Sequence, residues 1–295
     1  MDTTTLQTER KELKLNDIEL FSYIEQRLDN QELVLPTLPD VAFEANDLLA
    51  DENVDIDDIV YVIKKDQGIA ASVVKFANSA LVRGNQKITS IEQATIRIGL
   101  NRLRNVIMTS AVAQIFFAKD VSFAIQLTNA WSQSTDVAVS SGATINYLKS
   151  KGIAKHIDHD TLFLAALVHN IGLLPIFTEA DRLGKSLDKK FLDRAFVSKV
   201  IESKGRELTK RVLDQWEFDK SIITAAYESR NLGYQTEDVS MIDILRLGMS
   251  NTDAISDNKK EAIIEISKSK GLIEDKSWKD SKQFRIELLS YKDLF

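Results

Sequence analysis

The sequence predicts an all-α protein of two packed helical bundles, and three observations carry that prediction. The chain holds only 11 Gly and 3 Pro in 295 residues, whereas average proteins use about 7% Gly and 5% Pro. A β-sandwich or barrel needs turn residues about every 8–12 positions, so this chain lacks the punctuation of such folds. Apolar residues recur instead at helical spacing, and the run Leu162 to Val168 is apolar on every side of a helix. Such a helix must lie in the middle of a bundle.

The N-terminal third is predicted to be an extension followed by a helical lobe. Residues 1–30 form the extension, with a short amphipathic helix that begins at Asp17. The segment Leu35-Pro36-Thr37-Leu38-Pro39 is a rigid connector, because the residue before each proline is driven to extended geometry. Residues 31–120 form the N-terminal lobe, with helices expected at 40–50, from Asp55, at 67–78, from Ser90 to Gly99, and at 101–117.

The remainder is predicted to be a second lobe, residues 121–255, and a C-terminal helical extension, residues 256–295. Apolar periodicity and glycine spacing place helices at 122–150, 159–180, 187–203, 205–216, 219–230, 240–254 and 257–270. Each of these boundaries rests on local pattern alone.

Composition excludes several classes of function. With no Cys and only three His, disulfide scaffolds, Cys nucleophiles and Cys-ligated metal sites are absent. The longest purely apolar run has seven residues, Leu162 to Val168, whereas a bilayer span needs about 20. We therefore expect a cytoplasmic protein without a membrane partner. A net charge of −6 argues weakly against nucleic acid.

The segment His169-Asn170-Ile171-Gly172 follows the apolar run. Burial of a polar pair there is costly unless it is hydrogen-bonded or ligates something. Two interpretations stay open, a metal site built on a helical core and a hydrogen-bonded core histidine followed by a helix-terminal Asn. His156 and His159 precede the run in a polar loop, and we expect them to be exposed.

Several ordered segments resemble the HDOD domain, the HD-related output domain of bacterial signalling proteins. They are Leu35-Pro36-x-Leu38-Pro39, Lys75-Phe76-Ala77-Asn78-Ser79-Ala80, Ile88-x-Ser90-Ile91-Glu92-Gln93-Ala94 and Ile98-Gly99-Leu100-Asn101-Arg102-Leu103-Arg104, followed by His169-Asn170 in place of an His-Asp pair. The resemblance covers about residues 30–255.

This resemblance implies a degenerate metal site. Working HD enzymes hold divalent metal with His and Asp from several helices. The corresponding positions here are Gln133, His169, Asn170 and Asn251, with Gly205 and Ser229-Arg230 at the others, so only His169 survives. Hard cations prefer anionic oxygen ligands. We therefore predict no catalytic residues, no metal ligands and no cofactor.

Charge is distributed unevenly in the N-terminal lobe. Residues 75–104 hold six basic residues and one acid, a net charge of +5. Arg97, Arg102 and Arg104 are candidate docking residues for an acidic partner or an anionic ligand, and a plain solvated face is the competing interpretation. Residues 40–66 hold nine acids and two lysines, a net charge of −7, which argues against a DNA-binding helix-turn-helix there.

The predicted function is a catalytically inactive HD-type regulatory module. It would act in bacterial signal transduction by binding an unidentified signalling protein or a small anionic ligand. The alternative is a metal-dependent phosphohydrolase of the HD superfamily with atypical ligands, and the third possibility is a DNA-binding regulator.

Overall fold

A computed structural model describes residues 22–292, apart from 24, 25, 28, 31, 34, 52, 83, 117–121 and 187. Within these residues all regular structure is helical, and no strand occurs. The all-α prediction is therefore confirmed. The predicted helix from Asp17 falls largely outside the described residues, although Ser22, Tyr23, Gln26 and Arg27 are helical.

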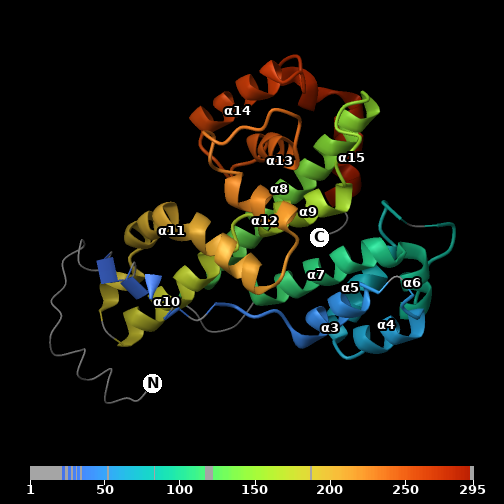
Figure 1. The fold of residues 1–295 in the computed structure, drawn as a ribbon, viewed down its shortest axis with the longest axis horizontal. Coiled ribbons are helices and arrows are strands. Elements are labelled where there is room, and N and C mark those ends of the chain that lie inside the picture. Colours follow the sequence, from blue (N-terminus) through green and yellow to red (C-terminus); the bar gives the residue numbers. More distant parts are fainter. Residues whose placement is uncertain are drawn as a thin grey trace.

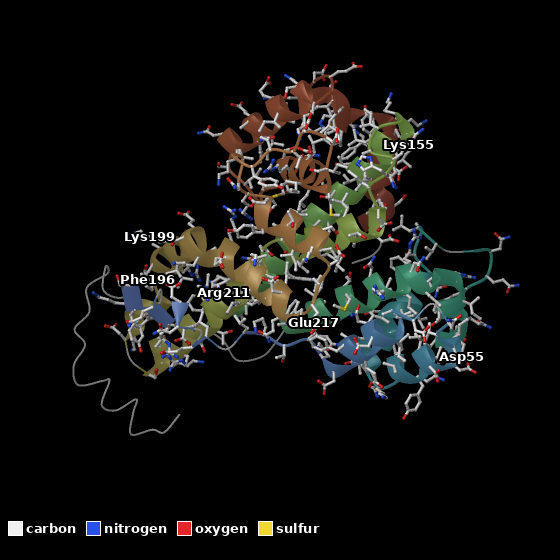
Figure 2. All side chains as sticks on the ribbon, viewed as in Figure 1. Asp55, Lys155, Phe196, Lys199, Arg211 and Glu217 are labelled. Carbon is white, nitrogen blue, oxygen red and sulfur yellow. The ribbon has the colours of Figure 1, made fainter. Side chains whose placement is uncertain are left out.

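Five helices form the N-terminal lobe: α3 (Asp40–Leu48), α4 (Ile56–Ile63), α5 (Gln67–Ala77), α6 (Ile91–Ile98) and α7 (Leu100–Phe116). They lie together at the right of Figure 1. Local signals set their ends as the sequence predicts. Asp55, at the outer edge of this lobe in Figure 2, accepts a hydrogen bond from the Asp57 backbone N–H. Ser90 accepts one from Gln93, and Gly99 ends α6 with a φ of 78°.

Polar side chains hold the loop between α5 and α6. The Asn78 amide donates to the carbonyl oxygens of Val74 and Ile88, and its Oδ1 accepts from the Ile88 backbone N–H. The Arg97 guanidinium donates to the carbonyl oxygens of Ala77 and Gln86. Asn78, which belongs to one of the segments that resemble the HDOD domain, therefore stabilises the loop between α5 and α6, as does Arg97.

Six α-helices and one short 3-10 helix follow in the second lobe. They are α8 (Ala124–Ser150), α9 (His159–Val168), α10 (Leu173–Ser186), η1 (Lys189–Leu192), α11 (Arg194–Gln215), α12 (Lys220–Glu228) and α13 (Met241–Ser250). The long helix α8 packs against α9, α13 and the later helix α15 (Lys282–Lys292).

Two helix boundaries in this lobe differ from the sequence prediction, and they meet at one contact. The helix expected over 159–180 breaks after α9, and those expected at 187–203 and 205–216 are joined in α11. A Cβ on Gly172 would lie 2.2 Å from the Gly205 carbonyl oxygen and 2.3 Å from the Thr209 nitrogen. The chain thus turns where it touches α11. Gly205 lies inside α11, where a Cβ would make only an ordinary van der Waals contact with Ile201 Cγ2, at 3.5 Å.

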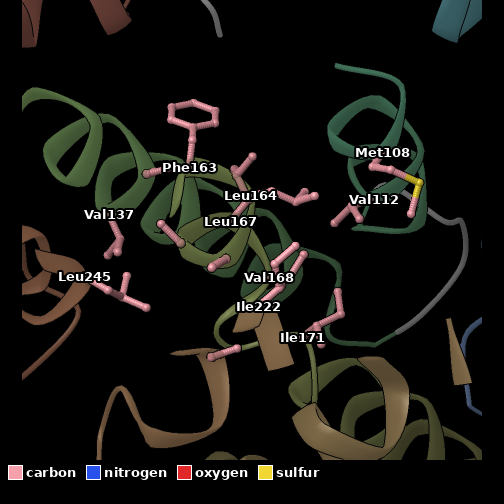
Figure 3. Close-up of a cluster of buried hydrophobic side chains, with 14 of the residues drawn as sticks. Met108, Val112, Val137, Phe163, Leu164, Leu167, Val168, Ile171, Ile222 and Leu245 are labelled. Carbon is pink, nitrogen blue, oxygen red and sulfur yellow. The ribbon is translucent and has the colours of Figure 1, made fainter. Parts of the chain in front are cut away.

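Helix α9 is the centre of the core. Leu164, Leu167 and Val168 are buried between residues of α7, α8, α12 and α13 (Figure 3). The stretch His159–Ser186 is long and apolar enough to cross a membrane by length and composition, but 83% of its most apolar window is buried inside the fold. It is the core of the second lobe.

The C-terminal extension packs back onto the second lobe. It comprises α14 (Asp257–Ser269), which packs on α13, a 3-10 helix η2 (Lys276–Asp280) and α15. Tyr291 of α15 is 2% exposed and fits against Gly142 of α8, where a Cβ would lie 2.9 Å from the Tyr291 ring.

Candidate functional site

His169 lies at the C-terminal end of α9 and is 3% exposed. Its Nδ1 donates to the Ala166 carbonyl oxygen at 2.7 Å, because a carbonyl can only accept. The Nε2 atom is then an acceptor, and it is buried without a hydrogen-bond partner. Such an orphaned polar atom requires an explanation.

Burial keeps His169 neutral. Desolvation, aided by the positive charge of Arg230, lowers the pKa of His169 to about 3, although the hydrogen bond to the Ala166 carbonyl opposes the shift. Arg230 lies just beyond Ser229, the C-cap of α12, and its guanidinium donates to the Ala254 carbonyl oxygen. The neighbourhood of His169 therefore disfavours added positive charge, whether from a proton or from a cation.

The neighbouring Asn170 has a different partner. Its Oδ1 accepts a hydrogen bond from Ser134 Oγ of α8 at 2.7 Å. A hydroxyl donating to a neutral amide is a structural contact between α8 and the end of α9. It engages the oxygen that would otherwise be the residue's ligand for a cation.

Gln133 and Asn251 lie together in a separate cleft of about 670 Å³ between α8 and the C-terminal segments. Gln133 is exposed, and Asn251 Nδ2 donates to Ser140 Oγ at 3.3 Å. The lining of this cleft contains neither His169 nor Asn170. The four residues predicted for the degenerate site are thus divided between a buried corner, His169 with Asn170, and this cleft.

The residues present do not fit a catalytic divalent metal. Across the part of the chain that the structure describes, no three His, Cys, Asp or Glu side chains gather in one place. His169 Nε2 offers a single neutral ligand, Arg230 contributes like charge, and Asn170 is engaged by Ser134. A metal that activates water needs about three protein ligands.

The three candidate docking arginines lie in different settings. Arg97 is tied to the backbone of the α5–α6 loop. Arg102 forms an ion pair with Asp160 of α9, Nε to Oδ2 at 2.8 Å, and so links the two lobes. Arg104 lines a polar cleft on another side of α7 together with Asp158 and Asp219. Arg102 and Arg104 thus line two different clefts, which share Asn105 and Asp160, and Arg97 lines neither of them.

His159 differs from the sequence expectation. His156 is exposed, with Nε2 near the Val239 carbonyl oxygen, but the side chain of His159 is only 17% exposed. His159 Nδ1 bonds to Asp160 Oδ1 at 2.9 Å, and the Tyr291 hydroxyl bonds to Nε2. The expectation of an exposed His159 is wrong, because α15 covers it; α15 lies in the predicted C-terminal helical extension, for which no helix beyond residue 270 was given.

A chain of polar contacts therefore runs from Arg102 through Asp160 and His159 to Tyr291. Burial raises the pKa of Asp160, but hydrogen bonds from His159 and Arg102 outweigh it and lower the pKa below its ordinary value. Burial, with Glu287, raises the pKa of Tyr291. The carboxylate is thus charged and the phenol neutral at neutral pH. This series of polar contacts could not be predicted from the sequence pattern, because Arg102, the Asp160–His159 pair and Tyr291 lie far apart in the sequence.

This chain is similar to known proteins in both sequence and fold. A model of the HDOD domain matches residues 35–232. A curated relative from Treponema pallidum, an uncharacterized protein, is 24% identical over 173 residues, which are 57% of this chain. The chain spans 30% of the length of that relative.

Solved structures share the fold over almost the whole chain. A candidate metal-dependent phosphohydrolase from Shewanella amazonensis is 25% identical with a TM-score of 0.84, over 94% of this chain and 98% of that one. An HDOD domain protein of unknown function from Geobacter sulfurreducens is 18% identical with a TM-score of 0.61, over 91% and 96%. A candidate signal transduction protein from Marinobacter aquaeolei is 17% identical with a TM-score of 0.56, over 100% and 67%.

Proposed function

The chain belongs to the HDOD domain family, and on that premise we propose that it is a regulatory module that performs no phosphohydrolysis and acts by binding. The observation that carries the proposal is the buried corner of His169 and Asn170. Its one imidazole is held neutral by burial and by Arg230, and its amide oxygen is engaged by Ser134.

Hydrolysis of a phosphodiester needs an activated water and stabilisation of developing negative charge. In HD enzymes the metal supplies both, and this corner offers one neutral nitrogen to hold it. What the corner does instead is structural. His169 caps α9 through Ala166, and Asn170 joins α9 to α8 through Ser134.

We propose that the module acts in the bacterial cytoplasm, on an unidentified signalling protein or a small anionic ligand. The family and the likeness to a candidate signal transduction protein of a bacterium support this. The burial of the stretch His159–Ser186 supports a location away from the bilayer.

Metal content tests the proposal. After dialysis, elemental analysis of the wild-type protein should find no stoichiometric iron, manganese, zinc or magnesium, and phosphodiester substrates should stay intact. Asn170→Asp should still bind no metal, because it supplies two ligands where about three are needed, and it should lose stability because its carboxylate would be partly desolvated.

The matched control is His156→Ala, which removes an exposed imidazole in place of a buried one. About one metal per chain that survives His156→Ala and is lost in His169→Ala would contradict the proposal. That result would favour the alternative, a metal-dependent phosphohydrolase with atypical ligands, in line with the Shewanella amazonensis protein.

A further inference from the structure

A pocket of about 310 Å³ lies between the two lobes. Its walls come from α5 and α7 of the N-terminal lobe and from α8 and α9 of the second lobe. We call it the interlobe pocket. Its volume is at the lower end of the range of about 300–1,000 Å³ typical of small-molecule sites. It contains none of His169, Asn170, Gln133 and Asn251.

Three aromatic side chains line the interlobe pocket. Phe76 comes from α5, Trp131 from α8 and Phe163 from α9. The Phe163 ring stacks on the Tyr291 ring, with ring centroids 5.9 Å apart and an interplanar angle of 28°. Trp131 packs against Phe116 at 5.3 Å and remains partly buried. Aromatic walls anchored in this way favour a planar ring system as ligand.

Two cations, Lys75 and Arg102, border the same pocket. Arg102 is positioned by its ion pair with Asp160, which uses Nε. The two Nη groups carry four further N–H donors, which is the geometry that binds carboxylate or phosphate oxygens in pairs. Asp160 itself is fixed by Arg102 and His159, and a carboxylate can accept more than these two hydrogen bonds.

We infer that the interlobe pocket binds a nucleoside monophosphate. The base would lie between the aromatic side chains, and the phosphate would meet Lys75 and Arg102. The ribose hydroxyls or a base amine would donate to Asp160, with Asn105 and Thr109 also in the wall. Inorganic phosphate would leave the aromatic walls unused, a nucleoside would leave the cations unused, and a simple aromatic carboxylate would bring no donor to Asp160.

The pocket size limits the ligand to one ring system and one anionic group, in contrast to a dinucleotide. Because both lobes supply walls of the pocket, a bound nucleotide would favour the arrangement in which the two lobes are in contact. It would therefore raise the melting temperature. This inference rests on the proposed function in that it names a class for the small anionic ligand, and its test is separate because neither the binding residues nor the readout involves His169.

The chain carries its own optical probe for this site. It has three tryptophans, and Trp216 and Trp278 are only 1% and 5% exposed. Trp131 is the one of the three that lines the interlobe pocket. Stacking of a base on Trp131 should quench its fluorescence, so the full chain can be titrated directly.

The experiment titrates the full chain with AMP, GMP, CMP and UMP, and in parallel with the matching nucleosides and inorganic phosphate. We expect saturable quenching by at least one nucleotide, with about tenfold weaker binding of the matching nucleoside or of phosphate, since charge-assisted hydrogen bonds to the phosphate are lost in one case and stacking in the other. Trp131→Phe should abolish the quenching while the nucleotide still raises the melting temperature.

Charge variants locate the site. Arg102→Gln and Lys75→Gln should each weaken nucleotide binding about tenfold, and Arg104→Gln, two residues along α7 and outside the interlobe pocket, should not. Lys75 is exposed, so its variant keeps the test valid if Arg102→Gln fails to fold. Absence of binding by AMP, GMP, CMP and UMP at millimolar concentration would overturn the inference. Equal affinity for phosphate and nucleotide, or equal weakening by Arg104→Gln, would also overturn it.

Discussion

The two ends of helix α9 differ in what they can do. At the C-terminal end, His169 and Asn170 are held by short contacts to Ala166 and Ser134, in surroundings that disfavour added positive charge. At the N-terminal end, Asp160 and Phe163 face a pocket that takes two cations and one aromatic ring, Phe76, from the other lobe. One end is filled by the fold, and the other is open to a ligand.

The most conspicuous sequence motif and the binding site of a protein need not coincide. The His-Asn pair is conspicuous in the sequence because it stands at the end of an apolar helix. The interlobe pocket has no comparable signature, because its lining comes from four helices that contribute between one and six residues each. Chemistry that needs several groups depends on what tertiary structure brings together, so each end of α9 has to be tested separately.

The largest effect is expected at the tight contact beside the buried corner. Gly172→Ala would place a Cβ 2.2–2.8 Å from backbone atoms of Gly205, Leu208 and Thr209. Backbone cannot yield as a side chain does, so we expect a loss of about 3 kcal/mol or more in the free energy of unfolding, or no folded protein. Urea denaturation measures this.

Gly205→Ala is the matched control, across the same contact. Its Cβ would meet only Ile201 Cγ2, at 3.5 Å. In a helix interior, Ala is favoured over Gly by about 0.5–1 kcal/mol, so this variant should be as stable as wild type or slightly more so. A Gly172→Ala protein within about 1 kcal/mol of wild type would show that the corner is not rigid.

The contrast between these glycines also marks the limit of prediction from sequence. Caps such as Asp55 and Ser90 are local, so the five helices of the N-terminal lobe could be predicted. Gly172 and Gly205 both resemble helix stops, but one is a helix-packing contact and the other continues α11. A contact between residues 33 positions apart has no local signal.

Stability should fall with acid through His169. The folded state keeps His169 neutral down to a pKa of about 3, whereas the unfolded chain takes up a proton near pH 6.5. The stabilisation is therefore complete above about pH 6.5 and is lost as the pH falls toward 3, by up to about 1.4 kcal/mol per pH unit. Urea denaturation between about pH 7 and pH 5 measures the slope.

His169→Gln is the comparison for this slope. Its amide can still donate to the Ala166 carbonyl oxygen, but it does not titrate. The variant should therefore show a pH dependence smaller by about one proton. Equal slopes for the two proteins would mean that His169 takes up its proton over the same pH range in the folded and the unfolded state. The view that burial keeps His169 neutral in the folded protein would then be wrong.

The smallest effect is expected for the ion pair that borders the interlobe pocket. Arg102 and Asp160 are 39% and 23% exposed, so solvent screens their attraction. A double-mutant cycle with Arg102→Gln and Asp160→Asn should give a coupling energy of about 0.5–1 kcal/mol. A coupling near zero would mean that Asp160 does not position Arg102 for a ligand.

The site itself could be predicted only in part. The resemblance pointed to His169 and Asn170 as a pair. The partners Ser134 and Arg230, and the covering of His159 by Tyr291, depend on helix packing across the second lobe. Arg102 was singled out for its charge, but its partner Asp160 lies 58 residues away.

The central claim is that the chain binds a nucleotide at the N-terminal end of α9 and holds no metal ion at the C-terminal end of this helix. Crystals grown with Mn²⁺ and AMP, and measured for anomalous scattering of manganese, test both ends at once. The account predicts nucleotide density between Trp131 and Arg102 and no anomalous peak at His169 Nε2. A manganese peak at His169, with the interlobe pocket empty of nucleotide, would contradict it.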